Sequence, residues 1–235
     1  VYLHFASGTS AMYVWVNGEK VGYSEVTKSP AEFDITKYVR KGKNSLAVEV
    51  YRWSDGSYLE DQDFWRLSGI DNDVYLYSTA QVRIADFFAH PDLDAKYKDG
   101  LLSVDVKLKS FQETARKGQV VEVSLLDEGN KKLITQLTAL DVPANDFANI
   151  VITKKIKAPR LWTAETPNLY TLLVTLKDEK GAIIEATSCK IGFRKIEIKD
   201  GQLLVNGQHI LIKGTNIHEF DQFDGQHVGT ELMMK

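Results

Sequence analysis

Hydrophobic and polar residues alternate along most of this chain. In the run 101–111, LLSVDVKLKSF, Val104, Val106 and Leu108 share one face while polar residues take the other. A two-residue period is typical of a β-strand with one buried face. Comparable runs follow at 119–130, 131–140, 148–156, 169–178 and 182–193. Strands at this short spacing, with almost no helical period, predict an antiparallel sandwich of the immunoglobulin type over residues 82–194.

The first 80 residues show the same alternation with a different set of turns. In MYVWVNGEKVGYS, Asn17-Gly18 separates two β-rich runs and predicts a tight hairpin, because both residues tolerate positive φ. The run NSLAVEVYRW, residues 44–53, reads as a half-buried strand. The run 73–82 is expected to close this first unit near residue 80.

The last 40 residues change character. Asp200-Gly201 and Asn206-Gly207 predict two more hairpins, and a polar stretch then leads to GTELMMK, which predicts a helix with Thr230 as its N-cap. A strand, a loop and a helix in that order can start an α/β unit. Because the chain opens inside a strand-like pattern and closes on this incipient helix, we expect it to be part of a longer protein.

Composition narrows the possible partners. The net charge is −3, and Lys and Arg are scattered without a basic stripe, which argues against nucleic acid. Apolar runs fall short of the roughly 20 residues that a membrane-spanning helix needs. The single cysteine, Cys189, excludes an internal disulfide and is interpreted as a buried, inert thiol.

Residues 53–74, WSDGSYLEDQDFWRLSGIDNDV, crowd acids and large aromatics together. Aromatic rings pack on the apolar face of a pyranose and carboxylates accept hydrogen bonds from its hydroxyls, so a sugar site is one interpretation. Glycoside hydrolysis also needs two carboxyl groups, for which Glu60, Asp61 and Asp63 are candidates. The alternative is a solvated acidic loop with Trp53 and Trp65 as core residues. A calcium loop starting at residue 71 is rejected, because the required Gly and Glu are missing.

A second candidate site follows the apolar run HILIKGTN. His218 and Glu219 follow it, after Ile217. If the run is a barrel strand, its carboxyl end is where active-site residues gather. The alternative is an ordinary exposed loop. The histidines show no metal-binding spacing, which argues against zinc.

Four blocks of the sequence resemble one family. They are VNGEKVGYSEVTKSPAEFDIT, RWSDGSYLEDQDFWRLSGI, LWTAETPNLYTLLVTL and IGFRKIEIKDGQLLVNGQHILIKGTNIHE. They resemble, in order, the lac-type β-galactosidases of bacteria in glycoside hydrolase family 2. The resemblance implies a mostly β fold in three parts: a partial jelly-roll, sugar-binding-type domain (1–81), an immunoglobulin-like sandwich (82–194) and the beginning of a catalytic (β/α)8 TIM barrel (195–235).

The resemblance also implies roles for particular residues. Asp63, the second acid of the DQD motif, would contact galactose and a sodium ion, and His218 would line the galactose pocket. Ile217, Phe220 and Asp221 depart from the family pattern, so the finer subsite contacts are expected to differ. The acid/base and nucleophilic glutamates, with the magnesium ligands, would lie beyond Lys235.

The resulting expectation is a retaining β-galactosidase that hydrolyses terminal β-D-galactosyl residues of substrates such as lactose. The 235-residue chain itself is expected to be inactive, and the whole protein is expected to be a homo-oligomer. The alternatives are a β-glucuronidase or β-mannosidase of the same family, or a non-catalytic carbohydrate-binding or structural module. The sequence leaves the compartment open between bacterial cytoplasm and periplasm.

Overall fold

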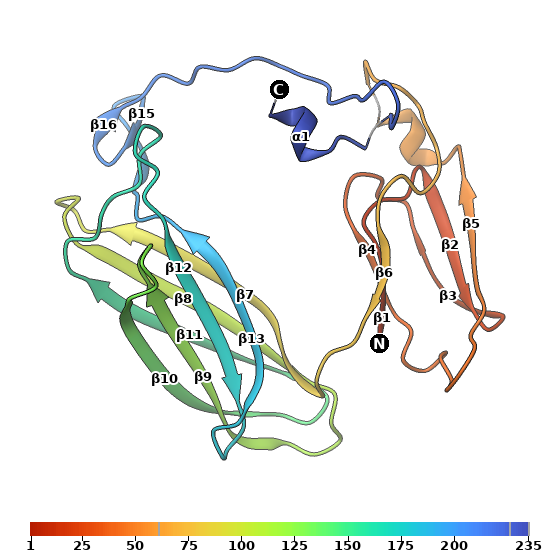
Figure 1. Cartoon of the computed structure of the whole chain (residues 1–235), viewed down its shortest axis with the longest axis horizontal. Helices are drawn as coiled ribbons and strands as arrows, with labels where there is room; N and C mark the ends of the chain where they lie inside the picture. The colour runs from red at the N-terminus through yellow and green to blue at the C-terminus, as the bar shows by residue number, and fades with distance from the viewer. Residues whose placement is uncertain (61, 226, 235) are drawn as a thin grey trace. The chain divides into compact units, whose positions relative to one another are not determined.

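The computed structural model describes residues 1–60, 62–225 and 227–234, and its fold is mostly β, as predicted (Figure 1). The chain divides into two compact units. The first joins Val1–Ser78 to Gly214–Lys235, and the second is Thr79–Lys213. The C-terminal segment therefore belongs to the same compact unit as the N-terminal strands.

The first unit is a sandwich of two antiparallel sheets, drawn in red and orange in Figure 1. One sheet has the order β4-β1-β6, from Ala31–Asp34, Tyr2–Phe5 and Val74–Tyr77. The other has the order β3-β2-β5, from Glu19–Ser24, Ala11–Val16 and Leu46–Tyr51. Asn17 and Gly18 both adopt positive φ between β2 and β3, which confirms the predicted hairpin.

The core of this unit lies between its two sheets. Leu3 and Phe5 of β1 pack with Met12 and Val14 of β2, and all four side chains are buried. Because alternate residues of a strand point to opposite faces, Tyr13 lies on the outer face of its sheet.

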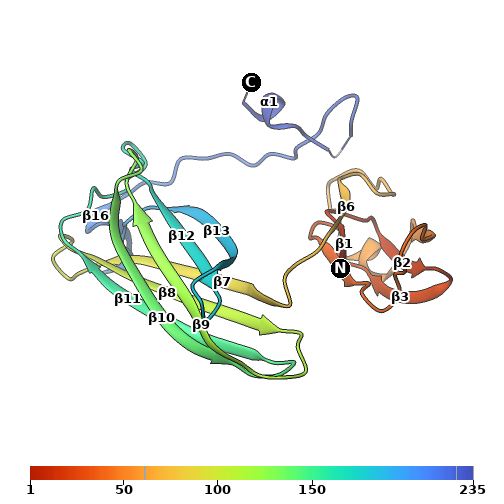
Figure 2. The same cartoon turned by 60° about the horizontal axis from the view of Figure 1, so that its bottom comes forward.

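The second unit is the immunoglobulin-like sandwich (Figure 2). Its sheets have the orders β10-β9-β12-β13 and β11-β8-β7. The strands are β7 Val82–Leu93, β8 Gly100–Ser110, β9 Arg116–Leu126, β10 Lys132–Val142, β11 Phe147–Ile156, β12 Tyr170–Lys177 and β13 Ile183–Ile191. The predicted inward face of β8 is confirmed, since Val104, Val106 and Leu108 are all buried.

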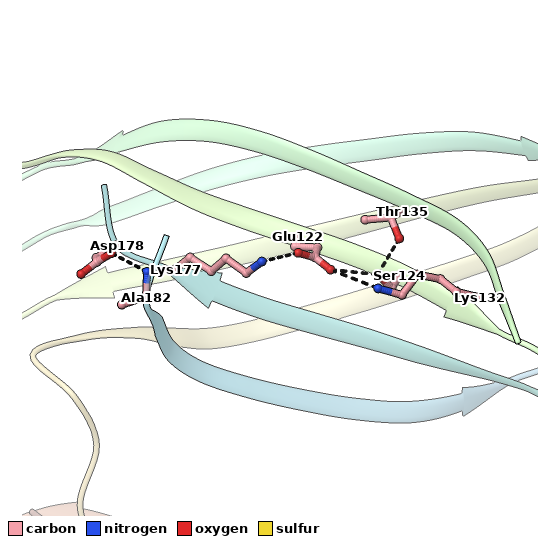
Figure 3. Close-up of polar contacts among 7 residues, drawn as sticks. All are labelled: Glu122, Ser124, Lys132, Thr135, Lys177, Asp178 and Ala182. Atoms are coloured by element: carbon pink, nitrogen blue, oxygen red, sulfur yellow. Dashed lines mark hydrogen bonds and ion pairs between the residues drawn. The ribbon is translucent and has the colours of Figure 1, made fainter. Parts of the chain in front are cut away.

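A polar cluster lies on the outer face of β9. Figure 3 shows the Lys177 ammonium reaching the Glu122 carboxylate, which also accepts a hydrogen bond from Ser124 at 3.2 Å. Lys132 approaches the same carboxylate at 3.7 Å. The Glu122 side chain is only 13% exposed, so this ion pair is shielded from solvent.

Strand β7 was not predicted from the sequence. Its pairing with β8 shifts register between Ile84 and Asp86, and it contains Pro91. The bulge interrupts the two-residue period, and proline is usually evidence against a central strand. Because β7 is at the edge of its sheet, the missing amide of Pro91 is tolerated there.

A small antiparallel sheet ends the second unit. Its strands are β14 Ile196–Lys199, β15 Gln202–Val205 and β16 Gln208–His209, joined by the two predicted hairpins. Asn206 fastens this sheet to the sandwich by donating a hydrogen bond to the carbonyl of Trp162 at 3.0 Å.

The segment 211–220 forms no regular strand in the structure. Its apolar residues Leu211 and Ile212 are largely exposed, as expected of a run that has no paired neighbour among the described residues. Helix α1 covers Thr230–Met233, so the predicted helix is present, but its N-cap is Gly229 rather than Thr230. Within the described part of the chain, helices are too short or too polar to cross a membrane.

Candidate functional site

The acidic stretch begins from a rigid turn. Strand β5 ends at Tyr51, and a short 3-10 helix, η1, covers Asp55–Tyr58. Ser57 is buried, and its hydroxyl donates to Ser10 at 3.0 Å, while Ser10 donates to Ser54 at 2.8 Å. This chain of hydroxyls ties the start of the acidic stretch to Ser10, the residue before β2.

Two of the acids serve the loop itself. Glu60 is half-buried and accepts a hydrogen bond from the Thr27 hydroxyl, and Asp71 accepts one from Ser7. These contacts fix the two ends of the loop to the segments that follow β3 and β1. Asp61 lies outside the described residues.

The tryptophans are not core residues, so the alternative that placed them in the sandwich interior is wrong. Trp53 is 52% exposed and Trp65 is 58% exposed. The guanidinium groups of Arg52 and Arg66 lie over the Trp53 ring, at 5.6 and 5.8 Å from its centroid. The aromatic surface therefore faces outward at this end of the unit, and it carries positive charge.

Asp63 is exposed and adopts φ +57°, a left-handed conformation that costs a non-glycine residue free energy. The residue after it, Phe64, stacks on His218: the ring centroids are 5.0 Å apart and the planes differ by 20°. Trp65 stacks in turn on Phe220, at 5.1 Å and 15°. The structure thus brings the loops of both candidate sites together within one unit. The contact is made by the consecutive residues Phe64 and Trp65 of the first loop.

The loop that carries His218 has its own turn. Asp221 accepts hydrogen bonds from the amides of Phe223 at 2.6 Å and Asp224 at 3.0 Å, and pairs through its backbone with Gly225. These amide hydrogen bonds hold the pKa of the Asp221 carboxyl below its usual range. Asp221, a departure from the family pattern, therefore shapes the loop.

A charged cavity of about 390 Å³ lies in the same unit. Its walls come from both chain segments of the unit, Arg66 and Asp71 from one and Asp224 from the other. The remaining lining residues are Thr9, Arg52, Leu67, Ser68 and Gly69. Side chains of both signs and a hydroxyl give this cavity hydrogen-bonding groups suited to a polar ligand.

The described residues do not fit a complete cation site. They contain no group of three His, Cys, Asp or Glu side chains arranged to hold a metal ion. The Asp63 carboxylate carries hard oxygen donors, but a single carboxylate supplies at most two of the six or more oxygens that Mg²⁺ or Ca²⁺ takes. A sodium or magnesium ion would need most of its ligands from other groups.

Sequence reasoning singled out Asp63 and His218 but missed the residues that connect their loops. Phe64 and Trp65 follow the DQD motif directly, and Phe220 was noted only as a departure from the family pattern. One signal was available in the sequence: ring-bearing residues stand close together in each of the two segments, Phe64 and Trp65 in one and His218 and Phe220 in the other. Their pairing depends on the return of the chain after residue 213, which no local pattern reveals.

Family profiles match the chain in three consecutive parts. Residues 1–80 match "Glycosyl hydrolases family 2, sugar binding domain", residues 82–194 match "Glycosyl hydrolases family 2", and residues 196–235 match "Glycosyl hydrolases family 2, TIM barrel domain". The last match covers the segment that forms no regular barrel strand here.

Curated relatives align with nearly all of the chain. A protein of Priestia megaterium named β-galactosidase is 49% identical over 226 residues, which are 96% of this chain and 22% of that protein. A β-galactosidase of Photobacterium profundum is 45% identical, over 97% of this chain and 22% of its own length. The chain therefore spans about a fifth of the length of these relatives.

Solved structures share the fold. A putative β-galactosidase from Bacteroides fragilis superposes with a TM-score of 0.86 at 22% identity, over 98% of this chain and 36% of that one. A Bifidobacterium dentium β-glucuronidase, complexed with coumarin-3-O-glucuronide, superposes with a TM-score of 0.83 at 25% identity. The superposition covers 99% of this chain and 43% of that one. A calcium-binding mutant of Bacteroides uniformis β-glucuronidase 2 superposes with a TM-score of 0.80 at 19% identity, over 97% of this chain and 28% of that one.

Proposed function

The chain belongs to glycoside hydrolase family 2. We propose that it contributes one side of the sugar pocket of a retaining β-galactosidase. Such an enzyme hydrolyses terminal β-D-galactosyl residues, as in lactose. Relatives at 40–49% identity named β-galactosidase support this substrate class. We further propose that the domain borders lie at 81/82 and 194/195.

One observation carries the proposal: the Phe64 ring stacks on the His218 ring at 5.0 Å. Asp63 precedes Phe64 in the chain, so this stack ties the carboxylate's loop to the imidazole's loop. In the proposed pocket, the Asp63 carboxylate accepts hydrogen bonds from galactose hydroxyls and the His218 imidazole donates one. Both groups are exposed and therefore available to a ligand.

The reaction proposed is a double displacement through a covalent galactosyl-enzyme and an oxocarbenium-like transition state. We assign the acid/base and the nucleophile to no residue of this chain; of its acids, Glu60 and Asp71 hold the loop in place. Asp63 and His218 would hold sugar hydroxyls whose hydrogen bonds strengthen as positive charge develops on the ring. Such contacts raise kcat rather than only tightening substrate binding.

A cation would add positive charge beside the substrate hydroxyls, and we propose Asp63 as one of its ligands. The calcium-binding mutant among the similar structures supports cation binding in that protein, whereas sodium and magnesium are our own expectation for this one. Because the chain alone forms no complete site among its described residues, no reaction step is derived through the ion.

A β-glucuronidase is the alternative that the structural similarities raise. A glucuronidase must bind the carboxylate of its sugar, and an arginine or lysine side chain in the pocket is the expected partner for that carboxylate. Arg52 and Arg66 line a cavity of the same unit, but Asp71 and Asp224 share it, and neither Asp63 nor His218 lines it, so it does not give the proposed pocket a site for a sugar carboxylate. The higher identity to proteins named β-galactosidase favours that activity.

A chimera tests the proposal. The matching segment of the Priestia megaterium relative is replaced by this chain, and hydrolysis of chromogenic β-galactoside, β-glucuronide and β-mannoside is measured. We expect turnover of the β-galactoside above the other two, and none by the 235-residue chain alone. A folded chimera that prefers the β-glucuronide, or cleaves none of the three, would overturn the proposal.

A further inference from the structure

A cavity of about 570 Å³ lies in the second unit and shares no residue with the Asp63–His218 site. It is bordered by β7 and β13, the edge strands of the two sheets of the sandwich, which lie side by side in Figure 1. Its other lining residues come from the segment before β12 and from the segment that follows β13. A volume of this size is within the range of small-molecule pockets, so the chemistry of the lining indicates which ligand it fits.

Trp162 is fixed in the wall of this cavity by its own backbone. Its amide donates to the carbonyl of Phe193 at 2.9 Å, and its carbonyl accepts a hydrogen bond from Asn206 at 3.0 Å. The Trp162 side chain packs on Gly192, where a Cβ would lie only 2.8 Å from it. This wall is therefore preorganised, which lowers the entropy lost when a ligand binds.

Arg194 brings a positive charge to the cavity. Its guanidinium lies over the Trp162 ring, 4.3 Å from the centroid, in a cation–π contact that restricts its position. In the described part of the chain it makes no ion pair with a carboxylate. A guanidinium presents its donors in a planar fork that matches a carboxylate through two parallel hydrogen bonds. Arg194 is therefore positioned to bind an anion that the described residues do not supply.

Lys190 lines the same cavity and adds a second positive charge. Its ammonium donates to the Thr171 hydroxyl at 2.7 Å and keeps further hydrogens to donate. Asp92 also lines the cavity, and one of its oxygens accepts a backbone amide at 2.8 Å. His90 is a further lining residue, with its imidazole 3.6 Å from the carboxylate of a β8 aspartate. Because Lys190 and Arg194 outnumber Asp92, the lining favours a negatively charged ligand.

Apolar side chains stand beside these two cations. Trp162 and Leu169 line the cavity and are half-buried, and Ile196, the first residue of β14, is 55% exposed there. Apolar surface that a ligand removes from water contributes to binding, whereas the carboxylate of the same ligand meets the guanidinium. The cavity therefore matches a molecule with an apolar group at one end and an anion at the other.

A peptide that adds a strand to the edge of β7 fits this place poorly. Pro91 has no amide hydrogen to donate to a new strand, and its carbonyl already accepts the Arg194 amide at 3.3 Å. Addition of a strand depends on free main-chain donors and acceptors along the edge. The backbone at this point favours a small molecule over an extended peptide.

We propose that this cavity binds a small carboxylate that carries an apolar ring, of the arylacetate type. The carboxylate accepts two hydrogen bonds from the Arg194 fork and one from the Lys190 ammonium. The ring lies against Leu169 and Ile196, and its rigidity limits the conformational entropy lost on binding. A neutral sugar would leave both cations without a negative partner. The site is independent of the proposed hydrolysis.

The test is a titration of the ¹⁵N-labelled 235-residue chain with phenylacetate, followed by amide NMR. We expect saturable shifts of the amides of Trp162, Lys190, Gly192 and Arg194. Two further probes separate the contributions, because 2-phenylethanol lacks the charge and acetate lacks the ring. Each should bind about tenfold more weakly than phenylacetate or worse, the loss expected when a charged hydrogen bond or a buried ring is removed.

Variants test the role of the guanidinium. Arg194→Gln should weaken phenylacetate binding about tenfold, whereas Arg194→Lys keeps the charge without the fork and should lose less. Arg160→Gln is the matched control, since Arg160 is an arginine of the same unit that pairs with Glu128 and does not line the cavity. Phenylacetate affinity should be unchanged in that variant.

The shift map of the unmutated chain decides the question even if Arg194→Gln unfolds. Absence of saturable shifts, or shifts confined to residues outside the cavity, would overturn the proposal. Equal affinity for 2-phenylethanol, for acetate or for lactose would do the same, as would unchanged phenylacetate affinity in folded Arg194→Gln. Because hydrolysis is not measured, these outcomes are distinct from those of the chimera.

Discussion

The phenyl ring of Phe64 lies nearly flat against the imidazole ring of His218, with the centroids 5.0 Å apart. The two residues come from segments separated by the whole second unit, yet they belong to the same compact unit. Offset stacking of this kind contributes about 0.5–1.5 kcal/mol beyond the area it buries. The contact therefore restricts the orientation of an otherwise exposed histidine.

Removal of the Phe64 ring should change the environment of His218 directly. Protons of an imidazole that lies over a phenyl ring are shifted upfield by the ring current, so Phe64→Ala should move the His218 ring resonances downfield in proton NMR. The matched control is Phe88→Ala in the second unit, which should move the resonances of His90, its ring neighbour at 4.2 Å, and leave His218 unchanged. Unmoved His218 resonances in Phe64→Ala would show that the stack does not form in solution.

The turn after His218 should depend on the Asp221 carboxylate. Asp221→Ala removes the acceptor for the Phe223 and Asp224 amides, so their hydrogen exchange should accelerate, while Asp221→Asn keeps an acceptor oxygen and should change it less. The hydrogen bonds depress the pKa of Asp221 in the folded chain. They are therefore at full strength above the usual carboxyl pKa and weaken as pH falls through the lowered value. Equal exchange in all three proteins at neutral pH would contradict this.

Acid should weaken the second unit through Glu122. The Lys177 ammonium beside this carboxylate holds its pKa below the ordinary 4.5. A depressed pKa means that the stabilisation is complete above 4.5 and declines as pH falls through the folded value. Glu122→Gln should lower the free energy of unfolding by about 1.5–3 kcal/mol at pH 7, the usual contribution of a hydrogen bond to a charged group.

Denaturant unfolding as a function of pH measures this effect. The difference between the parent chain and Glu122→Gln should shrink as pH falls from 4.5 through the lowered folded pKa, because the parent carboxyl is then progressively neutralised. The control is Glu128→Gln, whose carboxylate pairs with Arg160 at an exposed position and should matter little at any pH. A difference that stays constant with pH would assign the effect of Glu122 to packing instead.

Gly22 is needed for the packing of the first unit. A Cβ at this position would lie 2.6 Å from the Phe33 ring, so Gly22→Ala should lower the free energy of unfolding by about 1–3 kcal/mol. Phe33→Leu in the same protein should recover part of that loss, since the smaller side chain leaves room. Gly214→Ala, where a Cβ meets nothing within 4 Å, is the control. Thermal unfolding of the variants measures these differences in stability. A Gly22→Ala variant as stable as the parent chain would contradict the packing.

The strands and hairpins were predictable because their causes are local. The alternation around Val104 follows from the two faces of a strand, and Asn17-Gly18 follows from the positive φ of its turn. Strand β7 was missed because a bulge and Pro91 break the period, and proline is acceptable only once the strand is known to be at an edge.

The candidate site was predictable only in its polar residues. Asp63 and His218 were identified through a resemblance, whereas the stacking of Phe64 and Trp65 arises from tertiary contacts. One of the two interpretations placed both tryptophans in the core, but both are more than half exposed, and Trp65 stacks on Phe220. Which aromatic meets which depends on where the chain returns, and that information is not local.

The most direct test of the central claim, that Asp63 and His218 serve one galactose pocket, is a double-mutant cycle in the active chimera. The measurement is kcat/KM for a chromogenic β-galactoside with Asp63→Asn, His218→Asn and the double variant, and Asp73→Asn, an exposed acid of the same stretch, is the control. We predict a loss of about tenfold or more for each single variant and a coupling of about 0.5–3 kcal/mol between them. Strict additivity, or single variants as active as the Asp73→Asn control, would contradict a shared pocket.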